Sequence, residues 1–97
     1  MGVNYDHEER RGEDARRILE DELYKEAFAA IEARLVDQLA LAATTEEQAH
    51  HLRHLLIAHR KVRQYMANVL QTGTMAALEI NRQRTLAERV RERFRAA

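Results

Sequence analysis

Four of the five histidines lie within one short stretch of this 97-residue sequence: His50, His51, His54 and His59. His50 and His54 are spaced i and i+4, so on a helix both imidazoles would face one side and could bind one metal ion. No third ligand has a fixed position, and the sequence contains no cysteine. We therefore expect no metal site and no cofactor. The first three histidines should face solvent, and His59 should form a hydrogen bond across a seam between helices. An alternative is an assembly that depends on histidine protonation near neutral pH.

Few other residues could support catalysis. The sequence has no serine, and its three glycines, Gly2, Gly12 and Gly73, are isolated, so no glycine-rich phosphate loop is present. The carboxylates belong to mixed-charge helical faces and not to an apolar pocket that could perturb their pKa for acid–base work. These features predict a protein that is not an enzyme.

Basic side chains form two groups that could neutralise phosphates or bind an acidic partner. We predict that these groups comprise Arg60, Lys61 and Arg63, followed by Arg82, Arg84, Arg89, Arg91, Arg93 and Arg95. Interspersed glutamates such as Glu88 could instead form i, i+4 surface pairs with them. The net charge of zero is also unlike that of a dedicated DNA-binding protein.

Charge is unevenly distributed along the chain. Residues 1–22 contain eight acidic residues and four arginines, whereas residues 79–97 contain six arginines and three glutamates. Oppositely charged ends favour head-to-tail contacts between subunits, or an arginine-rich tail that binds an acidic partner.

No apolar run is long enough for a membrane span, and the charged N-terminus is unlike a signal peptide. We expect a cytoplasmic protein.

The elements that carry these residues are predicted to be long helices, because the sequence contains no proline and few glycines. From Glu13 to Ala42, apolar residues recur every three or four positions on a face too broad for one neighbouring helix. The excess predicts that a further helix or a second subunit covers this face, and we expect a homo-oligomer. The predicted interface comprises Leu23, Tyr24, Phe28, Ile31, Leu35, Leu52, Leu56, His59 and Met66.

A short turn should separate this helix from the next. Thr44 precedes Glu47 by three residues and Thr45 precedes Gln48 by three, so either threonine could begin a helix through a capping box. A loop of two or three residues would make the two helices antiparallel. Gly73 is then expected to end the second helix, and Thr74 to cap a third.

The sequence thus predicts an all-α chain, a long antiparallel helical hairpin with a C-terminal arginine-rich helix. Its predicted parts are a flexible arm at 1–12, the hairpin oligomerisation core at 13–74, and a C-terminal helix or tail at 75–97.

Two segments resemble small all-helical proteins of tailed bacteriophages and prophages. They are residues 20–39, EDELYKEAFAAIEARLVDQL, with an acidic entry into "LYKEAF", and residues 60–76, RKVRQYMANVLQTGTMA, with a basic "RKVRQYM" and a "TG" stop. The type they resemble is the small terminase subunit. That resemblance implies a helical hairpin assembled into a ring, which recruits the large terminase subunit or another phage protein and could contact double-stranded DNA. The usual DNA-recognition segment before the core has no counterpart in residues 1–17.

The sequence is therefore interpreted as a non-enzymatic DNA-packaging accessory. Two alternatives stay open: a helical DNA-binding regulator, or a virion or adaptor component without a nucleic-acid role.

Overall fold

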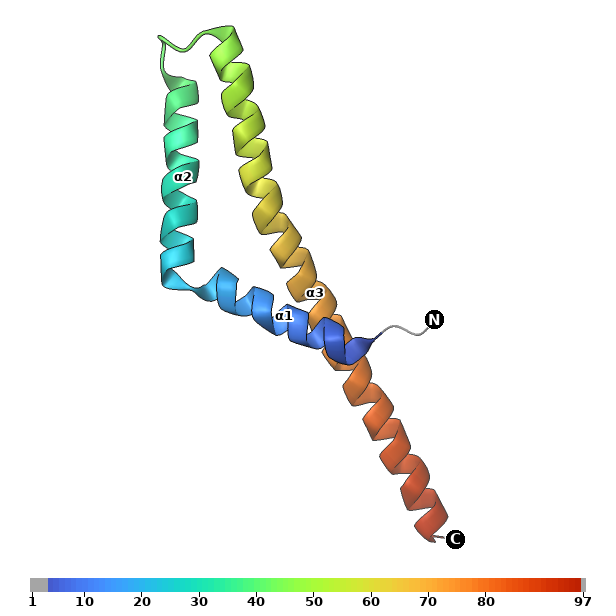
Figure 1. The fold of residues 1–97 in the computed structure, drawn as a ribbon. Coiled ribbons are helices and arrows are strands. Elements are labelled where there is room, and N and C mark those ends of the chain that lie inside the picture. The colour runs from blue at the N-terminus through green and yellow to red at the C-terminus, as the bar shows by residue number, and fades with distance from the viewer. Residues whose placement is uncertain (1–3, 97) are drawn as a thin grey trace.

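The computed structural model describes residues 4–96, which form three helices (Figure 1). These are α1 (Tyr5–Glu20), α2 (Glu22–Ala40) and α3 (Glu46–Ala96), and both shorter helices pack on α3. The 51 residues of α3 make the molecule elongated, with extents of 80 × 29 × 16 Å. Its radius of gyration is 21.9 Å, where a compact chain of this length would have about 12.5 Å. The all-helical prediction is confirmed.

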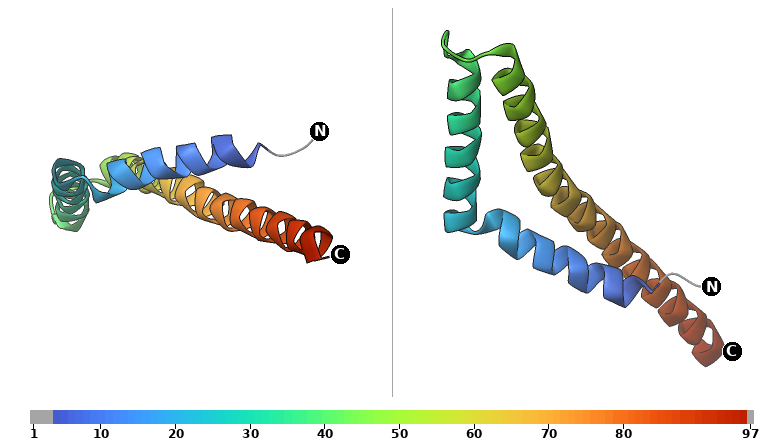
Figure 2. Two further views of the ribbon diagram at one scale, coloured as in Figure 1. Left: turned by 90° about the horizontal axis from the view of Figure 1, so that it is seen from below. Right: turned by 45° about the horizontal axis from the view of Figure 1, so that its top comes forward.

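α2 runs antiparallel to α3, whereas α1 crosses α3 obliquely (Figure 1). α2 lies along its first half, α1 crosses its middle, and the last part of α3 projects beyond α1 (Figures 1 and 2). The sequence predicts one helix from Glu13 to Ala42, but the structure breaks it at Asp21. The Asp21 side chain accepts a hydrogen bond from the backbone N–H of Tyr24 at 2.8 Å and caps α2. This cap lets the chain change direction between α1 and α2.

The predicted capping box after the turn is confirmed at Thr45. Its hydroxyl accepts a hydrogen bond from the Gln48 N–H at 3.1 Å, and the Gln48 side chain accepts one from the Thr45 N–H at 3.1 Å. The helices are antiparallel as predicted, although the connection at 41–45 is longer than expected. This longer connection is stabilised by Thr44, whose hydroxyl donates a hydrogen bond to the carbonyl O of Gln38 at 2.7 Å.

The prediction that Gly73 ends a helix is wrong, because α3 passes through Gly73 and Thr74 without a break. Neither Gly73 nor Gly12 has a positive φ. A Cβ on Gly73 would lie 2.6 Å from Cα of Gly12 and 2.9 Å from the carbonyl O of Glu8. Gly73 is therefore the place where two helix backbones touch.

The sequence predicts a flexible arm at 1–12, but the described part of this segment is helical and takes part in the crossing of α1 and α3. Residues 5–12 form the first half of α1 and lie against α3, while residues 1–3 fall outside the described part. The buried apolar residues of the described part are few and mostly small, namely Ala15, Leu56 and Ala76. Two of them, Ala15 and Ala76, each lie three residues after a crossing glycine, so small residues on both helices permit the close approach.

Replacing Gly73 with alanine tests the crossing. In a solvent-exposed helix this change would raise the free energy of unfolding by up to about 1 kcal/mol. Here we expect it to lower the free energy of unfolding by about 1–3 kcal/mol, because the new methyl group overlaps the backbone of α1. Urea denaturation followed by circular dichroism measures the change.

Gln71→Ala, an exposed change two residues away on the same helix, is the matched control and should have little effect. A Gly73→Ala variant more stable than wild type would show that α1 does not contact α3 at this point.

Candidate assembly and partner-binding surfaces

The seam between α2 and α3 is built around the ring of Phe28. The imidazole of His59 stacks on it with 3.9 Å between centroids, and the guanidinium of Arg63 lies 5.0 Å from its centroid. His59 Nε2 also donates a hydrogen bond to the Phe28 carbonyl O at 3.1 Å. The predicted hydrogen bond of His59 across a helix–helix seam is confirmed.

The structure divides the nine residues predicted for an oligomer interface into two groups. Seven of them are buried or half-buried on the sides of α2 and α3 that pack within one chain: Tyr24, Phe28, Leu35, Leu52, Leu56, His59 and Met66. Leu23 and Ile31 instead stay on the outside of α2, 72% and 51% exposed. Helical periodicity places residues on a common side, but it does not distinguish a helix of the same chain from one of another copy.

The outer side of α2 carries uncovered apolar residues together with exposed charged ones, among them Glu26 and Asp37. Twelve of the nineteen residues of α2 are apolar, yet none of its residues is buried. The large exposed ones are Leu23, Ile31 and Val36, and the alanines between them are exposed as well. A single copy of the chain therefore leaves most of the apolar surface of this helix in contact with water.

Two of the three residues in the first predicted basic group, Arg60 and Arg63, contact side chains of α2. Arg60 Nε donates to Glu32 Oε1 at 2.8 Å, and Arg63 lies over Phe28. Lys61 is exposed. The hydrogen bond from Arg60, with the positive charges nearby, lowers the pKa of Glu32 below its ordinary value. The sequence does not identify this pair, because its partners are far apart along the chain and meet only once the hairpin has formed.

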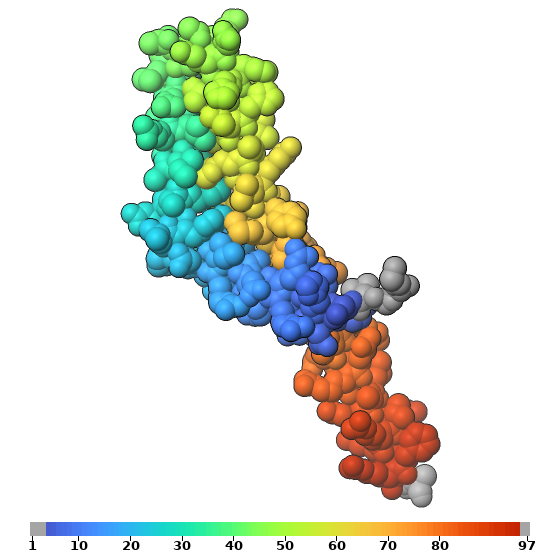
Figure 3. All heavy atoms as spheres, in the orientation of Figure 1, coloured from blue at the N-terminus to red at the C-terminus, as the bar shows by residue number. Residues whose placement is uncertain are grey.

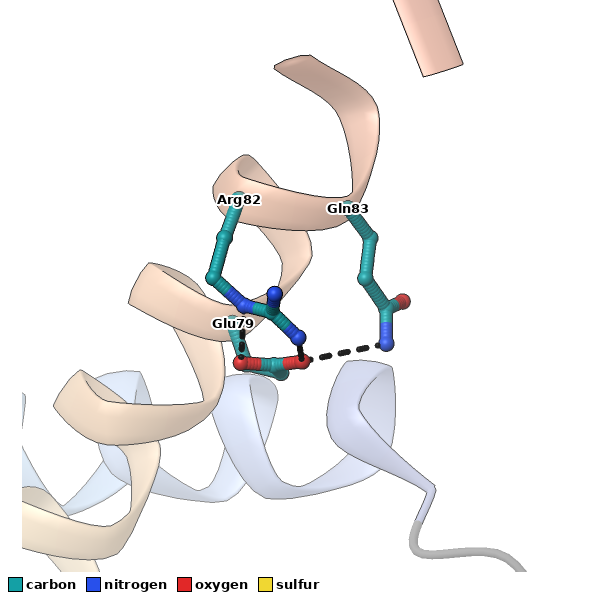
Figure 4. A network of polar contacts seen from close by, with 3 residues as sticks. All are labelled: Glu79, Arg82 and Gln83. Carbon is teal, nitrogen blue, oxygen red and sulfur yellow. Dashed lines mark hydrogen bonds and ion pairs between the residues drawn. The ribbon is translucent and has the colours of Figure 1, made fainter. Parts of the chain in front are cut away.

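The second basic group lies on the projecting part of α3. Figure 4 shows Arg82 and Gln83 both donating hydrogen bonds to the Glu79 carboxylate, beside the first turns of α1. The bidentate contact with Arg82 lowers the pKa of Glu79 and raises the pKa of Arg82. Arg84 donates to the side chain of Asn81 at 2.9 Å. The rest of the group, Arg89, Arg91, Arg93 and Arg95, is exposed and makes no ion pair within residues 4–96.

The histidines near the start of α3 lie together on an exposed surface. The rings of His50 and His54 meet edge to face with 4.5 Å between centroids, and His51 lines a shallow hollow between the ends of α2 and α3. In the described part of the chain, no group of three or more histidine or acidic side chains is close enough to bind a metal ion.

Compared with known protein families, curated proteins and solved structures, the chain matches none of them. None of the helices in residues 4–96 has an apolar stretch that could cross a lipid bilayer.

The hydroxyl of Tyr24 is buried without a hydrogen-bond partner among the described residues. A buried, unpaired hydroxyl lowers the stability of the folded state, so Tyr24→Phe should raise the free energy of unfolding by about 1 kcal/mol. Chemical denaturation of both proteins measures the difference.

Tyr65→Phe is the matched control, because the Tyr65 hydroxyl accepts a hydrogen bond from Arg11 at 3.1 Å and its loss should give no gain. A Tyr24→Phe variant less stable than wild type would show that this hydroxyl is hydrogen-bonded in solution.

The lowered pKa of Glu32 predicts a specific dependence of stability on pH. The pair with Arg60 stabilises the folded state when Glu32 is ionised, so its contribution is present at neutral pH. It is lost in the acidic range, as the pH falls below the ordinary pKa of a glutamate and through the lowered folded-state pKa of Glu32. In Glu32→Gln the melting temperature should therefore fall less steeply over this range.

The measurement is thermal melting by circular dichroism at a series of pH values. Glu26→Gln, which removes an exposed carboxylate from the same helix, serves as the control. Identical pH profiles for wild type and Glu32→Gln would contradict the prediction.

Proposed function

We propose that this protein is a non-enzymatic subunit that assembles with copies of itself. The observation that carries the proposal is the amount of surface left exposed. One copy exposes 8159 Å², whereas a compact protein of 11.3 kDa exposes about 5,700 Å². The difference of about 2,400 Å² is comparable with the area that stable dimers bury.

The exposed surface has the composition of an interface. Fourteen large apolar side chains are exposed within residues 4–96, and they occur on all three helices. Burying one such side chain contributes about 1.5–3 kcal/mol before the entropy of association is subtracted. A few of them on each copy would therefore be enough to hold an assembly together.

The outer face of α2 is the surface best suited to this contact. Its exposed alanines would allow the helix of another copy to approach closely, and Leu23 and Ile31 would supply larger apolar area at the same face. The opposite side of α2 is already occupied by α3 through the Phe28–His59 seam. Hence a neighbouring copy can cover α2 without opening the hairpin.

Among non-enzymatic self-assembling proteins, we propose for this chain the role of a phage DNA-packaging accessory of the small-terminase type. Support comes from the resemblance of residues 20–39 and 60–76, and from the antiparallel packing of the two helices that contain them. The projecting end of α3 carries exposed arginines through which an assembly could bind the packaging motor or DNA.

These arginines also favour a second candidate, a helical DNA-binding regulator. Duplex binding that weakens steeply with salt would support it, because each phosphate contact releases a counterion. A virion or adaptor component without a nucleic-acid role would instead bind a phage protein in fixed stoichiometry and would not retain duplex DNA.

Light scattering coupled to size-exclusion chromatography tests self-assembly directly. At tens of micromolar we expect a mass at least twice the 11.3 kDa of one chain. Ile31→Asp should shift the protein toward the monomer with its helix content retained, because this side chain is 51% exposed in a single copy.

Ile57→Asp, a similarly exposed change on the side of α3 turned away from α2, is the matched control and should leave the mass unchanged. A wild-type monomer at these concentrations would overturn the proposed function. Dissociation by Ile57→Asp alone would show that the interface does not include α2.

A further inference from the structure

The end of α3 is a helix without a neighbour. Beyond Arg82, no hydrogen bond or ion pair joins α3 to α1 or α2 in the described part of the chain. Figure 3 shows this end standing clear of the rest of the molecule. A helix of this length is marginally stable by itself in water, so packing against a partner would stabilise it.

One side of this helix is apolar. Leu86, Val90 and Phe94 follow each other at four-residue intervals and are 45%, 51% and 80% exposed. At 100° per residue they form a stripe along one side of the helix. Three exposed apolar residues in line are suited to packing against another protein, since a phosphate backbone offers them no apolar surface.

Arginines flank both edges of the stripe. Arg89 and Arg93 immediately precede Val90 and Phe94, so they lie about 100° to one side, and Arg91 lies about 100° to the other. The two glutamates of this segment, Glu88 and Glu92, are about 200° away on the opposite side of the helix. With five arginines and two glutamates, residues 83–95 have a net charge of +3. The same segment of a second copy would repel it, so the partner surface should be apolar and acidic.

The chain has such a surface where α1 meets α2. Residues 18–26, which we term the elbow, contain four acidic residues and one lysine, a net charge of −3. Their exposed apolar side chains include Ile18 and Leu23, at 45% and 72%. The negative charge of the elbow therefore complements the arginines beside the stripe, and the apolar side chains of the elbow can pack against the stripe itself.

We infer that the stripe of Leu86, Val90 and Phe94 docks on the elbow of a second copy. The contact must form between copies, because the continuous α3 carries residues 83–95 away from the elbow of its own chain (Figure 1). It joins two different surfaces, so it is head-to-tail and builds a ring if it closes or a filament if it does not. This inference rests on the proposed self-assembly and names the surfaces that would propagate it.

A charge-swap experiment tests the contact. The tail variant is Arg89→Glu with Arg93→Glu, and the elbow variant is Glu20→Arg with Glu26→Arg; both leave the Asp21 cap intact. Each variant alone should associate at least about tenfold more weakly than wild type, because tail and elbow then carry like charges. An equimolar mixture should regain the wild-type mass by light scattering, since each reversed surface meets its complement.

The control, Arg53→Glu with Lys61→Glu, changes the net charge as the tail variant does, at two exposed positions of α3 away from the elbow, the stripe and the outer side of α2, and should assemble normally. Assembly of the single variants at wild-type strength, or a mixture that stays dissociated, would overturn the head-to-tail contact while leaving self-assembly intact. So would a tail variant that loses only retention on duplex DNA, which would assign these arginines to phosphate binding. A wild-type monomer would overturn the proposed function itself.

Discussion

The contact between the backbones of Gly12 and Gly73 determines where the other parts of the molecule lie. It holds the first half of α1 against the middle of α3, and from there α1 leads away from α3 toward Asp21. α2 therefore starts at a distance from α3 and approaches it only toward the turn. Tyr24, Phe28 and Arg63 line a hollow beside the first turns of α2. A crossing made with larger residues would hold α1 farther from α3 and change the geometry of the hairpin.

The same arrangement explains why so little of the chain is buried. α1 and α2 follow one another along α3 instead of stacking on each other, so each has one neighbour for most of its length. A helix with one neighbour can bury only a narrow side, and α2 is apolar on a much broader face. The exposed apolar area is a consequence of this two-layer arrangement, and it is the physical basis of the proposed assembly.

Sequence patterns predict the local features of this fold well. The Thr45 capping box and the antiparallel helices follow from short-range chemistry, and the position of His59 in a seam follows from helical periodicity. The prediction for Gly73 is wrong because glycine occurs both at helix ends and where backbones touch, and only the position of Gly12 distinguishes these roles. The sequence does not predict the break at Asp21, because one aspartate is a weak signal within a continuous apolar period. The candidate interface could be predicted only as a set of apolar residues, since whether a face is covered by the same chain or by another depends on tertiary packing.

The unbroken α3 also fixes the distance between its seam with α2 and its projecting end. At about 1.5 Å per residue its 51 residues extend over about 76 Å. The seam with α2 and the projecting end are therefore held at a constant separation and a constant rotational phase. Each residue added or removed between them would shift the end by about 1.5 Å and turn it by about 100°. In an assembly of this chain, the distance and the rotation between successive copies would therefore depend on the length of α3.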